Sequence, residues 1–163
     1  MILFIILSFI LEGTISNLVS PNSIILPLFT MTSLVICYPY FNKTKKYHFI
    51  ITSIIIGIIY DIAYTNSLFI NTFTFIICCL IIIYIDNYIH DSLLNKTIIN
   101  IIMILLFKTI SYLLLFIFGF IKFNYNILLK GIYSSLVLNI IYGIILYFIC
   151  DFISRKFNLK KYE

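Results

Sequence analysis

Charged side chains are scarce in this sequence. Asp, Glu, Lys and Arg make up only 10% of its 163 residues, whereas 63% are hydrophobic and the mean hydropathy is +1.14. So little polar surface cannot cover a water-soluble globule. We therefore expect the bilayer to be the solvent of this chain, and we read the net charge of +5 as a signal of membrane orientation rather than of nucleic-acid binding.

The residue patterns of catalytic and metal sites are also missing. The four cysteines form no C-x-x-C spacing and are expected to be small buried hydrophobes. No Ser/His/Asp set and no glycine-rich phosphate loop occurs. Asp86, His90 and Asp91 superficially resemble a metal site, but we expect them in a solvated loop. The sequence predicts no enzyme activity, no cofactor and no metal.

Long apolar stretches dominate the chain instead. A membrane helix needs about 20 mostly apolar residues to cross a hydrocarbon core. Six stretches fit this length, with expected bounds 2–20, 24–41, 48–65, 68–86, 97–121 and 129–152. They leave only short loops, and so no room for a soluble module. We predict an all-α integral membrane protein with six transmembrane helices, forming a single domain over residues 1–163.

The basic residues predict the orientation. Eight of the eleven lie on one side of a six-span arrangement: Lys43, Lys45, Lys46, Lys96, Arg155, Lys156, Lys160 and Lys161. Lys122 and Lys130 lie on the other side, and Lys108 falls inside the fifth stretch. Cytoplasmic loops of membrane proteins carry an excess of Lys and Arg. Both termini are therefore expected in the cytoplasm.

Three ionisable residues fall within the predicted spans, namely Glu12, Asp61 and Lys108. Each lies roughly 15–20 Å from the cytoplasmic start of its helix, at 1.5 Å per residue. Leaving one alone in lipid would cost about 2.5–3.5 kcal/mol. We therefore expect all three to face inward, with Lys108 bonded to Glu12 or Asp61.

Small and polar residues recur at a spacing of four on three of the predicted helices, and hence along one face of each. They are Ser8 and Ser16 beside Glu12, Ser53 and Gly57 beside Asp61, and Gly131, Ser135, Asn139 and Gly143. Such stripes allow close helix packing and polar bonds between helices. They could also form a path for protons or substrate. Charges that can neutralise one another favour the packing interpretation.

Local patterns add a family resemblance. They are LEGT at 11–14, LVSP at 18–21, GIIYDIA at 57–63, LFINTF at 68–73 and LN at 138–139 before a basic tail. In this order and at this chain length they resemble the family of the rod shape-determining protein MreD. Gly57 and Asp61 match the signature of the family's third helix. Lys108 matches no pattern of the family.

The resemblance implies a non-enzymatic scaffold of the cell-elongation machinery in the bacterial cytoplasmic membrane. Such a protein binds MreC, and through it connects to MreB filaments, to RodA and to the transpeptidase partner of RodA. The resemblance also implies a fold similar to the substrate-binding subunits of energy-coupling-factor transporters. Gly57 is then expected to allow close helix approach, and Asp61 to anchor a polar contact or a helix end.

Two other functions stay open. A substrate-binding subunit for vitamin uptake would need an outward pocket with convergent polar groups. Asn66, Asn71, Thr72 and Tyr125 are the candidates for it. A small ion-coupled carrier would use Glu12, Asp61 and Lys108 as a proton relay, and usually has repeated halves or broken helices. The sequence shows no internal repeat.

Overall fold

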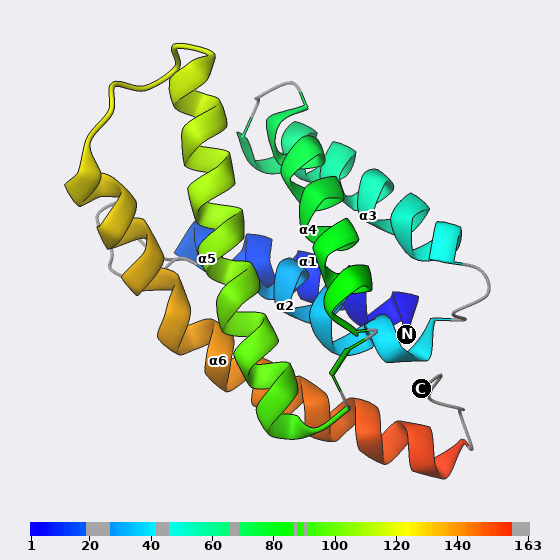
Figure 1. Ribbon diagram of the computed structural model, residues 1–163. Helices are drawn as coiled ribbons and strands as arrows, with labels where there is room; N and C mark the ends of the chain where they lie inside the picture. The colour runs from blue at the N-terminus through cyan, green and yellow to red at the C-terminus, as the bar shows by residue number, and fades with distance from the viewer. Residues whose placement is uncertain (19–26, 42–45, 66–68, 87, 90, 158–163) are drawn as a thin grey trace.

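Helices are the regular elements of the described part of the chain (Figure 1). The computed structural model describes residues 1–163 except 19–26, 42–45, 66–68, 87, 90 and 158–163. The α-helices are α1 (Ile2–Leu18), α2 (Phe29–Cys37), α3 (Lys46–Tyr60), α4 (Ile70–Asp86), α5 (Leu93–Ile117) and α6 (Tyr125–Lys156). A 3-10 turn, η1 (Tyr38–Tyr40), follows α2, and a π-helical turn, η3 (Asp61–Thr65), follows α3. The predicted all-α class is confirmed.

Among the described residues, three helical segments are long and apolar enough to cross a membrane. They are Lys46–Tyr64, Leu93–Ile117 and Tyr125–Lys156, with mean hydropathies of 1.6, 2.2 and 2.3. α1 and α4 are apolar but have 17 residues each, which corresponds to about 26 Å of helix. The count of six spans therefore stays a prediction.

The second predicted segment, 24–41, differs most from the structure. α2 has only nine residues, or about 14 Å of helix, and residues 24–26 lie outside the described part. Pro39 lies in η1 directly after α2; because proline lacks an N–H, it interrupts the regular hydrogen bonding of a helix. All nine residues of α2 are buried. α2 is thus a short central helix, in contact with α1, α4, α5 and α6.

The last two helices begin earlier than the hydropathy predicts, because polar residues cap them. The Ser92 hydroxyl accepts the Asn95 N–H at 3.2 Å, so α5 begins at Leu93 rather than at 97. The Asn124 side chain caps α6 by accepting the Asn126 N–H at 3.0 Å, so α6 begins at Tyr125 rather than at 129. α6 ends at Lys156, so its 32 residues span about 48 Å.

α3 and α4 run side by side, and α6 crosses below the other helices in this view (Figure 1). Gly57 permits the close approach of α3 and α4, because a Cβ there would lie 2.6 Å from the Thr72 Cα. Gly143 of α6 similarly permits close approach to α5, because a Cβ there would lie 3.0 Å from the Asn100 Nδ2 atom. Gly131 differs, since a Cβ there would meet nothing within 4 Å.

Apolar side chains fill the interior and also cover the outside. The core includes Phe49 and Phe75 together with all four cysteines. Large apolar residues such as Ile10 of α1 and Ile141 of α6 are exposed. A helix that is apolar on every face is typical of a membrane environment.

Candidate functional site

The first polar centre joins α1, α2 and α3. The Glu12 Oε2 atom accepts the Thr30 N–H at 2.8 Å and the Thr30 hydroxyl at 2.6 Å. Its Oε1 atom accepts the Tyr60 hydroxyl at 2.8 Å. Thr30 lies in the first turn of α2, where backbone N–H groups have no partner within the helix and the dipole favours a negative charge. The buried Glu12 carboxylate therefore caps α2 from a neighbouring helix.

In the second polar centre, too, a buried carboxylate accepts hydrogen bonds from the first turn of a helix. Asp61 Oδ1 accepts the Asn71 N–H at 3.0 Å and the Asn71 side-chain amide at 2.9 Å. Asp61 Oδ2 accepts the Thr72 N–H at 2.9 Å and the Thr72 hydroxyl at 2.6 Å. Asn71 and Thr72 lie in the first turn of α4. A buried acid and a threonine thus hold the beginning of α4 to the end of α3.

The backbone around Asp61 departs from regular geometry on both sides of this contact. Asp61 is the first residue of η3, where the α-helix changes to π-helix, a change that is frequent at functional sites. Phe69, directly before α4, has a φ of 66°, which is uncommon for a bulky residue. Gly57 lies one turn before Asp61 and faces the Thr72 backbone. A larger side chain at Gly57 would separate Thr72 from Asp61.

Asn139 of α6 completes the capping of α2. Its Oδ1 atom accepts the Leu28 N–H at 2.8 Å, and Leu28 directly precedes α2. Its Nδ2 group donates to the Ser135 carbonyl oxygen. Its backbone oxygen accepts the Asn100 side-chain amide at 3.3 Å. The start of α2 is therefore held by side chains of α1 and α6, the first and last helices of the chain.

Lys108 lies half-buried on α5 and is attracted electrostatically to Glu12. Within the described structure it makes no contact at ion-pair distance with Glu12 or Asp61. The oxygens of both acids are instead engaged by donors at the beginnings of α2 and α4 and by the Tyr60 hydroxyl. The expected bond between Lys108 and an acid is thus replaced by attraction at longer range.

The predicted stripes of small residues are only partly inside the bundle. Ser8 shares a hydrogen bond of 2.6 Å with the Tyr142 hydroxyl, which joins α1 to α6. Ser53 donates to the Phe75 carbonyl oxygen at 3.1 Å, which joins α3 to α4. Ser135 is buried but donates to carbonyl oxygens of its own helix. Ser16 is exposed, and the space around Gly131 is open.

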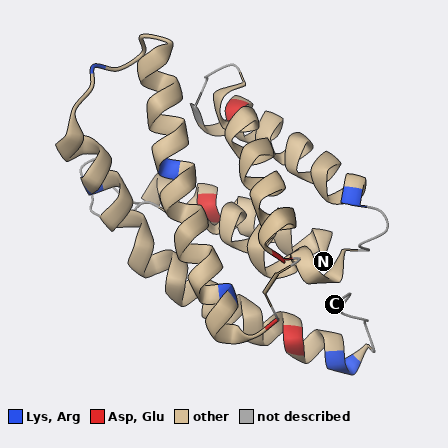
Figure 2. Ribbon diagram, viewed as in Figure 1, with Lys and Arg blue, Asp and Glu red and all other residues tan. Residues whose placement is uncertain are grey.

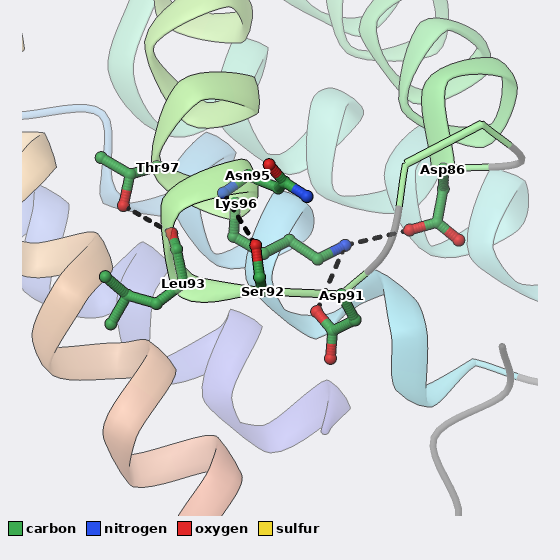
Figure 3. A network of polar contacts seen from close by, with 7 residues as sticks. All are labelled: Asp86, Asp91, Ser92, Leu93, Asn95, Lys96 and Thr97. Atoms are coloured by element: carbon green, nitrogen blue, oxygen red, sulfur yellow. Dashed lines mark hydrogen bonds and ion pairs between the residues drawn. The ribbon is translucent and has the colours of Figure 1, made fainter.

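A buried ionic cluster at the junction of α4 and α5 was not expected (Figure 3). The Lys96 Nζ atom lies 2.9 Å from Asp86 Oδ1 and 3.8 Å from Asp91 Oδ1. The side chains of Lys96, Asp86 and Asp91 are only 4%, 9% and 8% exposed. The predicted solvated loop is therefore wrong for the two acids, whereas His90 lies outside the described residues.

Helix register explains why Lys96 is buried. Because α5 begins at Leu93, Lys96 lies in its first turn, and Asn100, Met103 and Phe107 continue the same buried face. The i, i+4, i+7 spacing of Lys96, Asn100 and Met103 could have predicted this shared face. It was missed because the predicted helix began at 97 and so excluded Lys96. No group of three or more potential metal ligands occurs among the described residues.

Several other charged residues lie near helix ends. Figure 2 shows basic residues at the start of α3 and at the end of α6, and in this view both lie toward the same end of the bundle as the N-terminus. Arg155 pairs with Asp151 one turn earlier at 2.8 Å, and its side chain is 81% exposed. Arg155 at the end of α6 thus differs from the interior acids, because it is exposed whereas they are buried.

These features define a class, namely an all-helical membrane protein whose interior acids hold helix ends. The sequence model of the family described as rod shape-determining protein MreD matches residues 1–157 of the 163-residue chain. The chain belongs to this family, and the resemblance that the sequence motifs indicated is confirmed. No curated protein and no solved structure matches the chain. The family is a membrane family that acts in determining rod shape, and it is not known as an enzyme.

Proposed function

We propose that this protein is a non-enzymatic scaffold of the rod complex in the bacterial cytoplasmic membrane. It crosses the membrane six times with both termini in the cytoplasm, and it binds the transmembrane helix of MreC. Through MreC it connects to MreB, to RodA and to the transpeptidase partner of RodA, and so supports cell shape and peptidoglycan synthesis. The observation that carries this proposal is the match to the MreD family over residues 1–157.

The use of the buried acids supports a structural role. Glu12 and Asp61 accept hydrogen bonds from backbone and hydroxyl groups at the beginnings of α2 and α4. Backbone groups inside a membrane must be satisfied by the protein itself. Carboxylates that serve this purpose fix helix positions, and a rigid frame suits a scaffold that orients a partner.

The N-terminal part of α6 supports binding of an incoming helix. A Cβ at Gly131 would meet nothing within 4 Å, and Ile127, one turn earlier, is exposed. Small residues on a lipid-facing surface let two helix backbones approach closely. We place the MreC helix against this part of α6, with exposed Ser16 of α1 as a second polar contact.

The test is co-purification of the tagged protein from its native membrane in mild detergent, followed by mass spectrometry. We expect MreC and wall-synthesis enzymes to be recovered with the wild-type chain. Recovery of an ATPase pair with a coupling subunit would instead establish the vitamin-transport alternative. Recovery of no partner protein from membranes that contain MreC would contradict the scaffold.

Variants of one helix locate the interface. We expect Gly131→Leu, which fills the open space, to reduce MreC recovery at unchanged membrane abundance. Ile141→Leu is the matched control, since it changes an exposed residue of α6 without changing its volume. Asp61→Leu removes the cap of α4 and should lower membrane abundance as well as binding. Equal recovery from Gly131→Leu and Ile141→Leu would place the interface elsewhere.

A further inference from the structure

The connection between α5 and α6 displays a row of aromatic rings. Phe118, Phe120 and Phe123 are 64%, 66% and 56% exposed, and Phe116 and Tyr125 beside them are also exposed. α5 and α6 are both long and apolar enough to cross a membrane. Their short connection therefore lies where the hydrocarbon core meets the headgroups. Rings at this depth are not forced into water, although the protein itself leaves them uncovered.

The backbone of this connection is held in one shape. The Tyr112 hydroxyl accepts the Asn124 N–H at 2.6 Å and donates to the Asn124 carbonyl oxygen at 3.0 Å. Gly119 has a φ of 76°, a left-handed conformation that glycine adopts at little cost. The Phe123 ring packs edge-on against Tyr112 and Phe116, with centroids 6.0 and 5.6 Å apart. The rings are thus presented by a defined turn.

The charge near these rings is entirely positive. Lys122 lies between Phe120 and Phe123 and is exposed, as is Lys130 on the first turns of α6. The sequence contains no Asp or Glu from residue 92 to residue 150. No acid of this 92–150 stretch is therefore available to neutralise the two lysines, so an external anion is their expected counter-charge. The membrane interface supplies phosphate groups at this depth.

We propose that residues 116–125 form a lipid-binding turn, which inserts its aromatic rings at the boundary between acyl chains and headgroups and places Lys122 on the phosphate of an anionic lipid. Phe rings bury themselves on the acyl side of this boundary, and the amphipathic Tyr125 ring suits it because one side is apolar and the other is wet. A lysine extends its apolar stem along the same boundary while its ammonium stays in the polar layer. A protein partner in the aqueous phase would instead require the rings to project away from the lipid.

The absence of tryptophan makes the depth of the turn measurable. The chain has no Trp, so Phe120→Trp introduces the only tryptophan fluorophore. The full-length variant is reconstituted in vesicles of equal parts phosphatidylglycerol and phosphatidylcholine. Its fluorescence is quenched by lipids brominated at different acyl positions and, separately, by acrylamide in water. Ile141→Trp, on an exposed face within α6, is the matched control for a deep position.

We expect the tryptophan at 120 to be quenched most by bromines near the glycerol backbone and weakly by acrylamide. The tryptophan at 141 should be quenched most by bromines deep in the acyl chains. Strong acrylamide quenching at 120 with no effect of brominated lipids would overturn insertion of the turn. Such a result would favour an aqueous protein partner.

The contact of Lys122 with lipid phosphate is tested in the Phe120→Trp variant. With Lys122 present, bromolipid quenching at position 120 should be stronger in vesicles containing phosphatidylglycerol than in phosphatidylcholine alone. Lys122→Gln should abolish this difference while leaving quenching in phosphatidylcholine unchanged. If the difference persists in Lys122→Gln, the assignment of the lysine to a lipid phosphate is wrong.

Discussion

The carboxylate of Glu12 accepts both the backbone N–H and the hydroxyl of Thr30, at 2.8 and 2.6 Å. Asp61 accepts the same two groups from Thr72, at 2.9 and 2.6 Å. The interior acids thus take the place of water at the beginnings of α2 and α4. A helix that begins in a protein interior requires such partners, because water does not reach its unpaired N–H groups.

The substitution Glu12→Gln should destabilise the fold. The introduced side chain keeps one acceptor oxygen but turns an amide NH₂ toward Thr30 or Tyr60, so one buried donor loses its acceptor. The cost of such a loss is about 1–3 kcal/mol. Thermal unfolding in detergent can be followed by a thiol-reactive dye, since the four cysteines are buried in the native fold.

Thr14→Val is the control for Glu12→Gln, because Thr14 is exposed and bonds to the Leu11 carbonyl oxygen of its own helix. Its unfolding temperature should stay close to that of the wild type. Equal unfolding temperatures for Glu12→Gln and Thr14→Val would contradict the capping role of Glu12.

The substitution Gly57→Ala should separate α3 from α4. The added methyl group would lie 2.6 Å from the Thr72 Cα, and backbone atoms cannot move aside as a flexible side chain can. Overpacking of this kind costs about 1–3 kcal/mol. Gly131→Ala is matched in chemistry but has open space, so it should stabilise α6 by roughly 0.5–1 kcal/mol. The unfolding temperatures of both variants are compared with that of the wild type in one detergent. A shift of the same sign in both variants would refute the predicted contrast.

The substitution Lys96→Met should weaken the junction of α4 and α5. It removes the ammonium that lies against Asp86 and Asp91 and leaves two carboxylates buried without it. Breaking a buried ion pair costs about 3–5 kcal/mol. Arg155→Met breaks an exposed pair instead, which costs about 0–1 kcal/mol. Hydrogen exchange of the first turns of α5 measures the difference. If both variants exchange at the wild-type rate there, the cluster has no structural role.

The substitution Lys108→Met should leave the stability unchanged or raise it. Lys108 contributes attraction at a distance to Glu12 but makes no contact at ion-pair distance with it within the described structure. Removing a cation from apolar surroundings offsets the loss of that attraction. A decrease of about 3–5 kcal/mol, the cost of breaking a buried ion pair, would contradict this expectation and indicate a direct bond between Lys108 and Glu12. The unfolding temperatures of Lys108→Met, Glu12→Gln and the wild type are measured in the same detergent.

Hydropathy predicted the all-α class and the approximate positions of most helices, because lipid selects long apolar stretches. It could not predict the length of α2, since a helix enclosed by other helices is as apolar as one in contact with lipid. The nine-residue α2 and η1 with Pro39 therefore appeared as one span. Pro27 falls near the start of that predicted span, whereas α2 begins only at Phe29.

The polar centres were predictable in position but not in partners. Depth along the predicted helices led us to expect Glu12 and Asp61 in the interior, and both are buried. Their donors include backbone N–H groups of α2 and α4 as well as side chains. Those N–H groups lack a partner within their own helix only because the helices begin at Phe29 and Ile70. The expectation that Lys108 bonds to one of the two acids did not consider such uncharged donors. Lys96 was overlooked for a related reason, because the Ser92 cap extends α5 beyond the apolar stretch.

The hydrogen bond from the Leu28 N–H to Asn139 sets an order of events during biosynthesis. The two residues are 111 positions apart, and a ribosome adds about 5–20 residues per second. α2 therefore emerges many seconds before its final acceptor exists. Until α6 has been synthesised, the Leu28 N–H lacks the acceptor that it has in the finished fold. The capping of α2 is thus completed only after α6 has been made.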